Sequence, residues 1–263
     1  MLRIIVIGGN GQLGSELSTY FENLGHVVFL WSHEDIEITN YRESYFSIDN
    51  INADLVINTA AMHDVEKCEE YPNLAYSINA LGVKNIAVIS SKLEIPFVHF
   101  STDYVFDGEK GEPYYEDDPT SPINEYGRTK LVGERFIQEH TDKYFIIRVC
   151  GLYGRFKCRA KASENFVNLM LKSALDRKEI KVVDYEILSP TYTLTIAEQL
   201  DELIKTTSFG VYHMTSNGGC SWFDFATKIF QLSGQSIDVI KASKHDFPGK
   251  TQRPLFSVLA NGG

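Results

Sequence analysis

The stretch Leu2–Gly14, LRIIVIGGNGQLG, decides the fold of this chain of 263 residues. Its first half is an apolar run rich in β-branched residues, which predicts a fully buried strand of a parallel sheet. The glycine-rich GGNGQLG follows, and the next segment, SELSTYFENLG, has helical composition and a glycine stop at Gly25. The order of strand, glycine turn and helix predicts the first unit of a dinucleotide-binding α/β domain.

Each glycine of this turn has a mechanical use. Gly8 permits the tight turn, Gly11 lets backbone approach a pyrophosphate, and Gly14 allows the helix to pack closely on the strand. The start of the helix, with Gln12 and Leu13, offers unpaired N–H groups and the positive end of the helix dipole to phosphates. We therefore predict that these residues bind a cofactor. The alternative is a glycine turn without a ligand.

Further apolar strands alternate with segments of helix length: HVVFLW, ADLVINTA, PFVHFS and YFIIRVC. This alternation predicts an α/β fold with a doubly wound parallel sheet of the Rossmann type. Beyond Gly154 we expect helices over Ala162–Lys178, over Thr195–Thr206 and from Ser221, with EIKVVD and GVYHMT between them. The predicted domains are a dinucleotide-binding domain over 1–154 and a smaller C-terminal substrate-binding lobe, mainly over 155–263 and interleaved with the sheet edge.

Tyr126 and Lys130 stand four residues apart in NEYGRTKLVGERF, downstream of Ser101-Thr102-Asp103. A helix over Asn124–Glu139 places the phenol and the ammonium on one face. The pKa of a free phenol is about 10, and a lysine cation a few ångströms away lowers it. The pattern predicts that Tyr126 is an acid or base, with Thr102 hydrogen-bonded to the same substrate oxygen. The alternative is an exposed tyrosine beside a solvated lysine.

Composition excludes several classes of protein. With 25 basic and 35 acidic residues the net charge is −10, which argues against a nucleic-acid surface. No apolar run approaches the roughly 18 residues of a membrane span, and MLRIIVIGGNG predicts a core strand instead of a signal peptide, so we expect a cytoplasmic protein without a membrane partner. The acidic loop Glu109–Pro122 is expected to be exposed. Reduced thiols, without a disulfide scaffold or zinc site, are expected at all four cysteines: Cys68, Cys150, Cys158 and Cys220.

The spacing G-x-x-G-x-x-G and the Tyr126-x-x-x-Lys130 pair resemble the extended short-chain dehydrogenase/reductase superfamily. Further blocks follow in the order seen in dTDP-4-dehydrorhamnose reductases: STDYVFDG, NEYGRTKLVGE, RVCGLYG, SPTYT and RPLFSVL. This resemblance covers nearly the whole chain. It implies an NAD(P)H-dependent oxidoreductase that reduces the C4 ketone of dTDP-4-dehydro-L-rhamnose to dTDP-L-rhamnose, in nucleotide-sugar and polysaccharide biosynthesis.

The resemblance also implies the residues of the site. The implied catalytic set is Thr102, Tyr126 and Lys130, of which Tyr126 and Lys130 also bind the cofactor, Lys130 at the nicotinamide ribose. Further cofactor contacts are implied for Glu37 and Ile38 at the adenine and for Ala60 and Ala61 at the pyrophosphate and nicotinamide ribose. The implied substrate-binding residues are Thr102, Asp103, Tyr104, Tyr126 and Arg253. Arg253 suits a diphosphate because its guanidinium fork matches phosphate oxygens, and the alternative for it is a surface salt bridge.

Cofactor choice depends on the turn Trp31-Ser32-His33 after the second predicted strand. Sheets that prefer NAD usually place a carboxylate there. Ser32 and His33 can instead donate to a 2′-phosphate, and we expect the following carboxylates of Glu34 and Asp35 to point away. The sequence thus predicts NADPH, with NADH allowed. The alternative is that Ser32 and His33 only cap the turn.

Two features depart from the family pattern. Several members carry an aromatic residue where Gly151 stands, and the family continues through another helix after the RPLFSVL block, so we expect a C-terminal truncation.

Some members bind Mg²⁺ through glutamates that include the position of Glu16, but a lone carboxylate on a helix is usually solvated, and we predict no metal. Asn79, in YSINALGVKNIA, is expected to face solvent, the alternative being a position near Lys130. A homodimer is compatible with the sequence.

Competing functions share the same motifs. Another nucleotide-sugar reductase, epimerase or dehydratase would keep the glycine turn and the Tyr-Lys pair. Dehydratases of the superfamily follow the threonine with an acidic pair, whereas this chain has Asp103-Tyr104, which favours reduction. A non-catalytic NADP-binding regulatory subunit, of the type found with methionine adenosyltransferase, is the alternative from a different class.

Overall fold

The computed structural model describes residues 1–157, 164–243, 246–247 and 251–261. As predicted, β1 (Arg3–Ile7) leads through the glycine turn into α1 (Gln12–Asn23), and Gly25 follows the helix end at φ 82°. The other elements of the larger part are β2 (Val27–Trp31), α2 (Tyr41–Asp49), β3 (Leu55–Asn58), α3 (Val65–Glu70), α4 (Pro72–Tyr76), the π-helix η1 (Ser77–Gly82), α5 (Val83–Lys92), β4 (Phe97–Thr102), the 3₁₀ turn η2 (Asp103–Val105), α6 (Glu125–His140), β5 (Tyr144–Val149), α8 (Thr193–Leu203) and β10 (Gly210–His213).

One sheet organises this part of the molecule. Its order is β10-β5-β4-β3-β1-β2, and every neighbouring pair is parallel. The doubly wound α/β fold is therefore confirmed. The chain moves outward from β1 to β2 and then crosses to β3 on the other side of β1, so the carboxyl ends of β1 and β3 flank the crevice where such sheets bind ligands.

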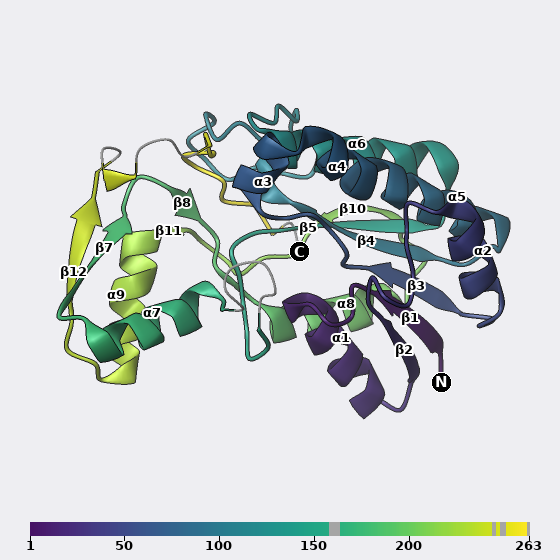
Figure 1. Ribbon diagram of the computed structural model, residues 1–263, viewed down its shortest axis with the longest axis horizontal. Helices are drawn as coiled ribbons and strands as arrows, with labels where there is room; N and C mark the ends of the chain where they lie inside the picture. The colour runs from purple at the N-terminus through teal and green to yellow at the C-terminus, as the bar shows by residue number, and fades with distance from the viewer. Residues whose placement is uncertain (158–163, 244–245, 248–250, 262–263) are drawn as a thin grey trace.

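Helices cover both faces of this sheet, as Figure 1 shows. Alternate side chains of β1, β3, β4 and β5 point to opposite faces, so each face has its own apolar core. On one face Leu17 of α1 and Leu200 of α8 pack over Val6. On the other face Ile86 of α5 and Ile137 of α6 pack over Val56. Packing in these two cores fixes the positions of α1 and α6 on the sheet. These two helices carry predicted site residues.

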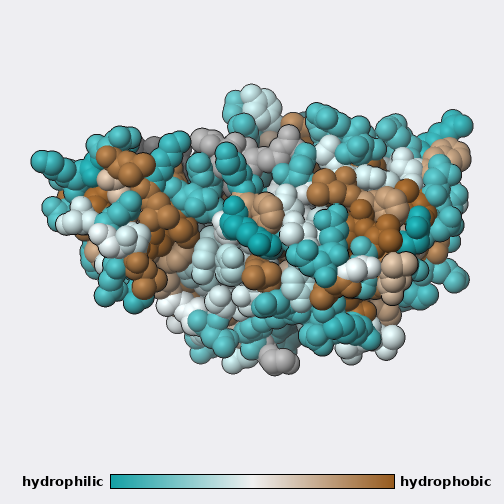
Figure 2. Space-filling view, turned by 90° about the horizontal axis from the view of Figure 1, so that it is seen from below, coloured by the Kyte–Doolittle hydropathy of each residue, from teal (hydrophilic) through white to brown (hydrophobic). Residues whose placement is uncertain are grey.

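The smaller lobe lies at the far end of the molecule from β2 (Figure 1). It contains α7 (Phe166–Asp176), β7 (Glu179–Val183), α9 (Trp222–Ser233) and β12 (Asp238–Ala242), joined by the short strands β6 (Leu152–Tyr153), β8 (Ile187–Leu188), β9 (Thr191–Tyr192) and β11 (Cys220–Ser221). The helices α7 and α9 pack on the parallel pair of β7 and β12 around Phe230. Apolar side chains also gather on the surface at the lobe end in Figure 2. Leu175 of α7 and Leu232 of α9 are exposed apolar residues of this lobe.

The predictions for this second half hold closely. The helix expected over Ala162–Lys178 begins at Phe166, although its first two predicted residues lie outside the described residues, and the helix expected from Ser221 is α9 with a capping box at Ser221. The segment GVYHMT contains β10, which completes the edge of the main sheet. Free thiols are found at Cys68, Cys150 and Cys220, while Cys158 lies outside the described residues.

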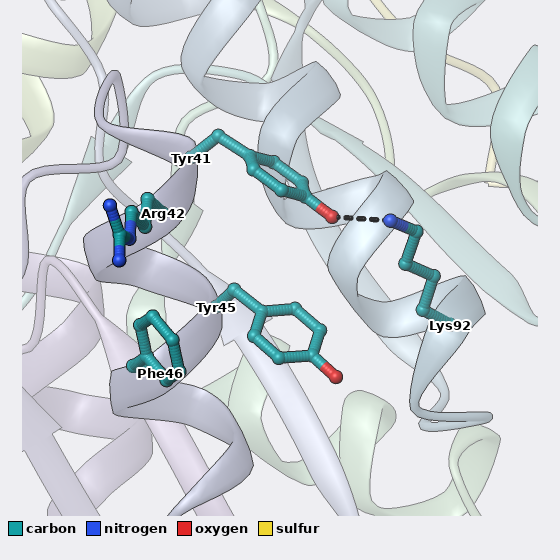
Figure 3. Close-up of a pocket in the computed structure, with 5 residues that line it drawn as sticks. All are labelled: Tyr41, Arg42, Tyr45, Phe46 and Lys92. Atoms are coloured by element: carbon teal, nitrogen blue, oxygen red, sulfur yellow. Dashed lines mark hydrogen bonds between the residues drawn. The ribbon is translucent and has the colours of Figure 1, made fainter.

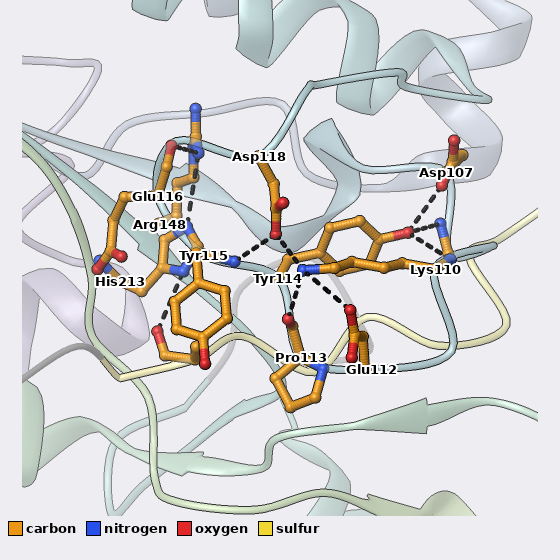
Figure 4. A network of polar contacts seen from close by, with 12 residues as sticks. Asp107, Lys110, Glu112, Pro113, Tyr114, Tyr115, Glu116, Asp118, Arg148 and His213 are labelled. Carbon is orange, nitrogen blue, oxygen red and sulfur yellow. Dashed lines mark hydrogen bonds and ion pairs between the residues drawn. The ribbon is translucent and has the colours of Figure 1, made fainter.

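The loop before α6 is exposed or partly exposed except at Tyr114, which is buried. The Tyr114 ring stacks on Phe106 with centroids 4.2 Å apart, and its hydroxyl donates to Asp107 at 2.7 Å. Its backbone N–H donates to Val258 O at 2.9 Å. Figure 4 shows how Lys110 and Asp118 close this loop around the buried ring. The loop is thus fastened to the C-terminal segment and enters α6 from a fixed direction.

No helix within the described ranges is both long enough and apolar enough to cross a lipid bilayer.

Candidate active site

The glycine turn has the shape that a dinucleotide needs. Gly8 has φ 77°, and a Cβ there would lie 2.7 Å from Ala60 N. A Cβ on Gly14 would lie 2.4 Å from Gly8 O, so only glycine lets α1 approach the turn this closely. Gly11 caps α1, and the first-turn N–H groups at Gln12 and Leu13 have no partner within the helix. These residues fit a dinucleotide, because added side chains would fill its cradle.

The turn after β2 corrects one expectation about cofactor choice. The Asp35 carboxylate does not point away: it accepts hydrogen bonds from Ser32 N at 2.7 Å and from Ser32 Oγ at 2.9 Å. These two bonds lower the pKa of Asp35, so the carboxylate is ionised at neutral pH. Ser32 thus caps the turn, as in the alternative interpretation, and a negative charge lies at the end of β2. His33 is exposed beside it.

The residues predicted to contact the adenine differ in exposure. Ile38 is buried in the core under α5, where a Cβ on Gly82 would touch it at 2.7 Å. Glu37 is exposed, and its carboxylate accepts from Thr39 N at 3.0 Å and from Thr39 Oγ1 at 2.8 Å. On the neighbouring strand end, Ala60 and the partly exposed Ala61 directly follow β3 and Thr59.

The structure brings Thr102 and Tyr126 together. Thr102 is the last residue of β4 and is 4% exposed, while Tyr126 lies in the first turn of α6, which Asn124 caps by accepting from Gly127 N at 2.8 Å. The Thr102 hydroxyl is hydrogen-bonded to the Tyr126 phenol. A Cβ on Gly127 would lie 2.1 Å from Tyr104 O, so a glycine there lets the first turn of α6 touch η2, which directly follows β4.

Asp103 and Tyr104 lie on either side of this pair. The Tyr104 ring meets the Tyr126 ring edge-on, with centroids 5.7 Å apart. Asp103 is 5% exposed, and its carboxylate accepts from Thr102 Oγ1 at 3.0 Å and from Cys150 Sγ at 3.0 Å. Burial raises the pKa of Asp103, and these donors oppose the shift. The cluster is therefore polar and closely hydrogen-bonded, with Thr102 and Asp103 buried and with Tyr104 and Tyr126 partly exposed.

The expected effect of Lys130 on Tyr126 is not found in this structure. Burial raises the pKa of Tyr126 above its ordinary value, and the hydrogen bond with Thr102 opposes this shift. The Lys130 amine instead lies 3.0 Å from His99 Nε2 and donates to Phe100 O at 2.6 Å. Lys130 is 2% exposed, and this burial lowers its pKa to about 7. The spacing of four residues placed both side chains on one helix face, but β4 offers Lys130 closer partners.

We expect Lys130→Met to stabilise the fold at neutral and acidic pH. The unfolded chain holds the lysine proton up to a pH near 10.5, whereas the folded chain loses it near 7. Stability due to this group therefore rises as the pH increases between these values, and its full cost is present below the lower one. Methionine removes that cost, so urea unfolding at several pH values should show the largest gain below pH 7. A gain that does not change with pH would contradict this assignment.

Asn79 corrects a second expectation. It is fully buried in η1 instead of facing solvent. Its side chain accepts from Met62 N at 2.8 Å and donates to Met62 O at 2.9 Å and to Thr129 Oγ1 at 3.1 Å. Asn79 thus ties the loop after Ala61 to the residue beside Lys130. The apolar neighbours of Asn79 in YSINALG were the sequence signal for its burial.

Arg253 has features of both predicted roles, the surface salt bridge and the diphosphate ligand. Its Nη2 lies 3.3 Å from Glu66 Oε1, and Glu66 also accepts from Thr251 N at 2.9 Å. The buried Arg253 Nε has no hydrogen-bond partner among the described residues. Tyr104 and Glu186 lie close enough to raise the pKa of Arg253. The guanidinium is thus near the Thr102 cluster and only partly paired.

Two other features lie outside this cluster. Glu16 is fully buried, 2.8 Å from Arg155 Nη2, and accepts from Thr193 Oγ1 at 3.0 Å. The described residues contain no group of three His, Cys, Asp or Glu side chains placed to hold a metal. A shallow hollow between α2 and α5 is drawn in Figure 3, where Tyr41 accepts from Lys92 Nζ at 2.7 Å. None of the predicted site residues lines that hollow.

The parallel sheet, the glycine turn and the helix carrying Tyr126 and Lys130 define a dinucleotide-binding oxidoreductase of the Rossmann type. A family model described as RmlD substrate binding domain matches residues 2–262. The chain belongs to this family, that of the dTDP-4-dehydrorhamnose reductases, which are NAD(P)H-dependent oxidoreductases.

Individual relatives agree with this assignment. The chain is 37% identical over 261 residues to the spore coat polysaccharide biosynthesis protein SpsK of Bacillus subtilis, covering 99% of this chain and 90% of that protein. It is 33% identical over 279 residues to a dTDP-4-dehydrorhamnose reductase of Burkholderia thailandensis, covering 99% and 91%. The crystal structure of the Bacillus anthracis dTDP-4-dehydrorhamnose reductase in complex with NADP superposes with a TM-score of 0.94 at 36% identity, covering 99% and 90%. A Thermus thermophilus UDP-glucose 4-epimerase in complex with NAD shares the fold, with a TM-score of 0.82 at 18% identity, covering 97% and 90%.

Proposed function

We propose that Thr102, Tyr126 and Lys130 of this chain carry out the NAD(P)H-dependent reduction of the C4 ketone of dTDP-4-dehydro-L-rhamnose to dTDP-L-rhamnose. The observation that carries the proposal is the hydrogen-bonded pair of Thr102 and Tyr126, which lies at the carboxyl end of β4 near the dinucleotide turn. NADPH is the preferred cofactor of the proposal, and NADH is a second one.

The residues of the site have separate tasks in this reaction. A bound NADPH or NADH would supply the hydride that the carbonyl carbon receives. Tyr126 gives its proton to the carbonyl oxygen as negative charge develops there, and Thr102 stabilises that charge by a hydrogen bond. Because burial raises the pKa of Tyr126, the phenol holds its proton across the neutral pH range and is ready to act as the acid. Lys130, once charged, stabilises the phenolate that remains.

The remaining predicted residues fall into two groups. We assign the dinucleotide to the domain of residues 1–154, through the glycine turn, Ser32 and His33, Glu37 and Ile38, and Ala60 and Ala61. We assign the nucleotide sugar to the lobe of residues 155–263 together with Asp103, Tyr104 and Arg253. A homodimer is part of the same proposal, and sedimentation equilibrium of the purified chain tests it.

The reaction is tested by the loss of absorbance of NADPH when dTDP-4-dehydro-L-rhamnose is supplied, with dTDP-L-rhamnose identified as the product. Turnover with this sugar, and slower turnover with UDP-linked 4-keto sugars, would support the proposal. A folded protein that binds NADPH and turns over none of these sugars would overturn it in favour of a regulatory NADP-binding subunit. Release of water or inversion without net oxidation of NADPH would favour a dehydratase or epimerase.

We expect Asp35→Asn to shift cofactor preference further toward NADPH. The Asp35 carboxylate is ionised and lies at the end of β2, where a 2′-phosphate would add a second negative charge. Asparagine keeps an acceptor for Ser32 but removes the charge, so the KM for NADPH should fall several-fold while that for NADH changes little. Steady-state kinetics with both cofactors checks this, and Glu34→Asn next to it is the matched control. Equal effects of the two substitutions would contradict a specific role for Asp35.

We expect Arg253→Ala to raise the KM for the dTDP-sugar about 10- to 100-fold, the loss of one charge-assisted hydrogen bond to phosphate. Glu66→Gln should not raise it, because it only releases the guanidinium from its ion pair. The dissociation constant of NADPH should stay unchanged in both variants. Similar KM values for Arg253→Ala and the parent would leave Arg253 as a structural ion pair.

A further inference from the structure

A line of polar groups, most of them buried, joins Ala60, which follows β3 and Thr59, to Lys130. Ala60 N donates to Asn58 Oδ1 at 3.0 Å, and Asn58 Nδ2 lies 3.2 Å from His99 Nδ1. His99 Nε2 lies 3.0 Å from Lys130 Nζ, and Lys130 Nζ donates to Phe100 O at 2.6 Å. Asn58 and His99 are fully buried. The line therefore runs through the sheet from β3 to α6.

The donor and the acceptor of each hydrogen bond in this line follow from the bond at Ala60. A backbone N–H can only donate, so Asn58 presents its carbonyl oxygen to Ala60 and its NH₂ group to His99. His99 Nδ1 must then accept, which places the hydrogen of the neutral ring on Nε2. That hydrogen points at Lys130 Nζ. An ammonium has three donors and no acceptor. Lys130 can therefore accept the His99 hydrogen only as a neutral amine with a free lone pair.

We propose that His99 is a positioning residue that holds Lys130 as a neutral amine in the cofactor-free protein, and that dinucleotide binding charges Lys130 with uptake of one proton. This rests on the proposed function, which places Ala60 beside the pyrophosphate. A phosphate oxygen that accepts from Ala60 N competes with Asn58 Oδ1. The released Asn58 amide can turn its carbonyl toward His99.

The turned amide exchanges donor and acceptor in the hydrogen bonds from Asn58 through His99 to Lys130. His99 then carries its hydrogen on Nδ1 and accepts with Nε2, so Lys130 can donate to it as an ammonium. One proton enters from solvent and resides on Lys130, while His99 stays neutral and only changes tautomer. The charge on Lys130 then favours the Tyr126 phenolate. Lys130 thus promotes proton donation by Tyr126 only when a cofactor is bound.

The groups around Lys130 other than His99 do not hold it as a neutral amine. On its own helix, Tyr126 is one turn away, and Glu134 raises the pKa of Lys130 but is held by Arg148 of β5 at 2.8 Å. Among the described residues that the neighbouring β3 and η1 turn toward this region, Asn58 and Asn79 are uncharged. His99 of β4 is the titratable group in direct contact, and burial lowers its pKa well below the ordinary value. The ring therefore stays neutral while Lys130 titrates.

Proton uptake on cofactor binding tests the proposal without any sugar. NADPH is titrated into the protein by calorimetry in buffers of different ionisation enthalpy at a pH of about 8.5, where its 2′-phosphate is fully ionised. We expect the parent to take up close to one proton for each NADPH bound. Lys130→Met should take up none. His99→Gln should bind NADPH with uptake near zero, because the amide oxygen accepts from an ammonium before the cofactor arrives.

The matched control is His140→Asn, which removes a histidine in the last turn of α6, outside the proposed site, and should keep the uptake. Equal uptake by the parent and His99→Gln, or binding without uptake by the parent, would overturn this inference alone. Failure of the parent to bind NADPH would overturn the proposed function and this inference with it.

A second measurement needs no variant that has to fold. Nitrogen-15 shifts of the His99 ring distinguish its two tautomers in the parent protein. We expect hydrogen on Nε2 in the free protein and on Nδ1 with NADPH bound. Hydrogen on Nδ1 in the free protein would overturn the proposal.

Discussion

Tyr126→Phe should lower kcat about 10²- to 10⁴-fold, the range that a positioned general acid contributes. The variant removes one oxygen and keeps the ring, which continues to pack edge-on against Tyr104. The fold and the affinity for NADPH should therefore be close to those of the parent. The Thr102 hydroxyl remains hydrogen-bonded to Asp103, so the rest of the cluster keeps its partners.

Kinetics with and without the phenol separate proton donation from binding. Single-turnover oxidation of NADPH by the dTDP-sugar, compared with equilibrium binding of each ligand, checks the expectation. Tyr104→Phe is the matched control, because it removes a phenolic oxygen from the same ring pair without removing the proposed acid, and it should cost far less in kcat. A Tyr126→Phe variant with a kcat within a few-fold of the parent would assign the proton to another group.

Arg148→Met should lower the free energy of unfolding by about 3–5 kcal/mol, because it leaves the carboxylate of Glu134 buried without its cation. In the folded chain Arg148 Nε lies 3.1 Å and Nη2 2.8 Å from the two oxygens of Glu134. Their side chains are 5% and 2% exposed, and Ser101 donates to the same carboxylate. For a chain of this size the loss corresponds to a fall in Tm of about 10 °C.

The same substitution should affect the site, because the pair lies directly under the end of β4. Figure 4 shows Arg148 beside Glu116 and His213, and its Nη1 donates to Glu116 O at 3.2 Å. His213 Nδ1 donates to Ala260 O at 3.2 Å, which turns Nε2 toward Arg148. Arg148 thus joins α6, β5, β10 and the loop before α6.

Two controls make the measurement specific. Arg128→Met breaks the exposed ion pair of Arg128 with Glu125 on the same helix and should change stability by less than about 1 kcal/mol. The double variant Arg148→Met with Glu134→Leu removes both charges and should recover much of the lost stability. Chemical denaturation of the set checks these values. A loss as small in Arg148→Met as in Arg128→Met would contradict the role of the buried pair.

Gly151 illustrates how a departure from the family pattern has a local reason. Gly151 has φ 56°, and a Cβ there would lie 2.8 Å from Leu188. An aromatic residue at this position would be strained and would collide with β8. The backbone path between β5 and β6 therefore requires the glycine that this chain has.

The sequence by itself determined the fold and the neighbourhood of the predicted catalytic residues. Apolar strands of period two and helices with one apolar stripe encode which face is buried, so the order of β1 to β5 and the helix from Glu125 follow from local pattern. The glycine turn is also local, because Gly8 and Gly14 are required by a backbone path only seven residues long. The carboxyl ends of parallel strands meet at one edge, which placed Thr102 near the turn.

The tertiary structure alone decided which polar groups pair. Lys130 meets His99, 31 residues earlier in the chain, and Asn79 meets Thr129, 50 residues later. Arg148 finds Glu134, and Asp35 turns toward Ser32 instead of away from it. A buried polar group bonds whichever partner packing brings within about 3 Å. That choice depends on how strands and helices far apart in sequence settle against each other, and periodicity carries no record of it.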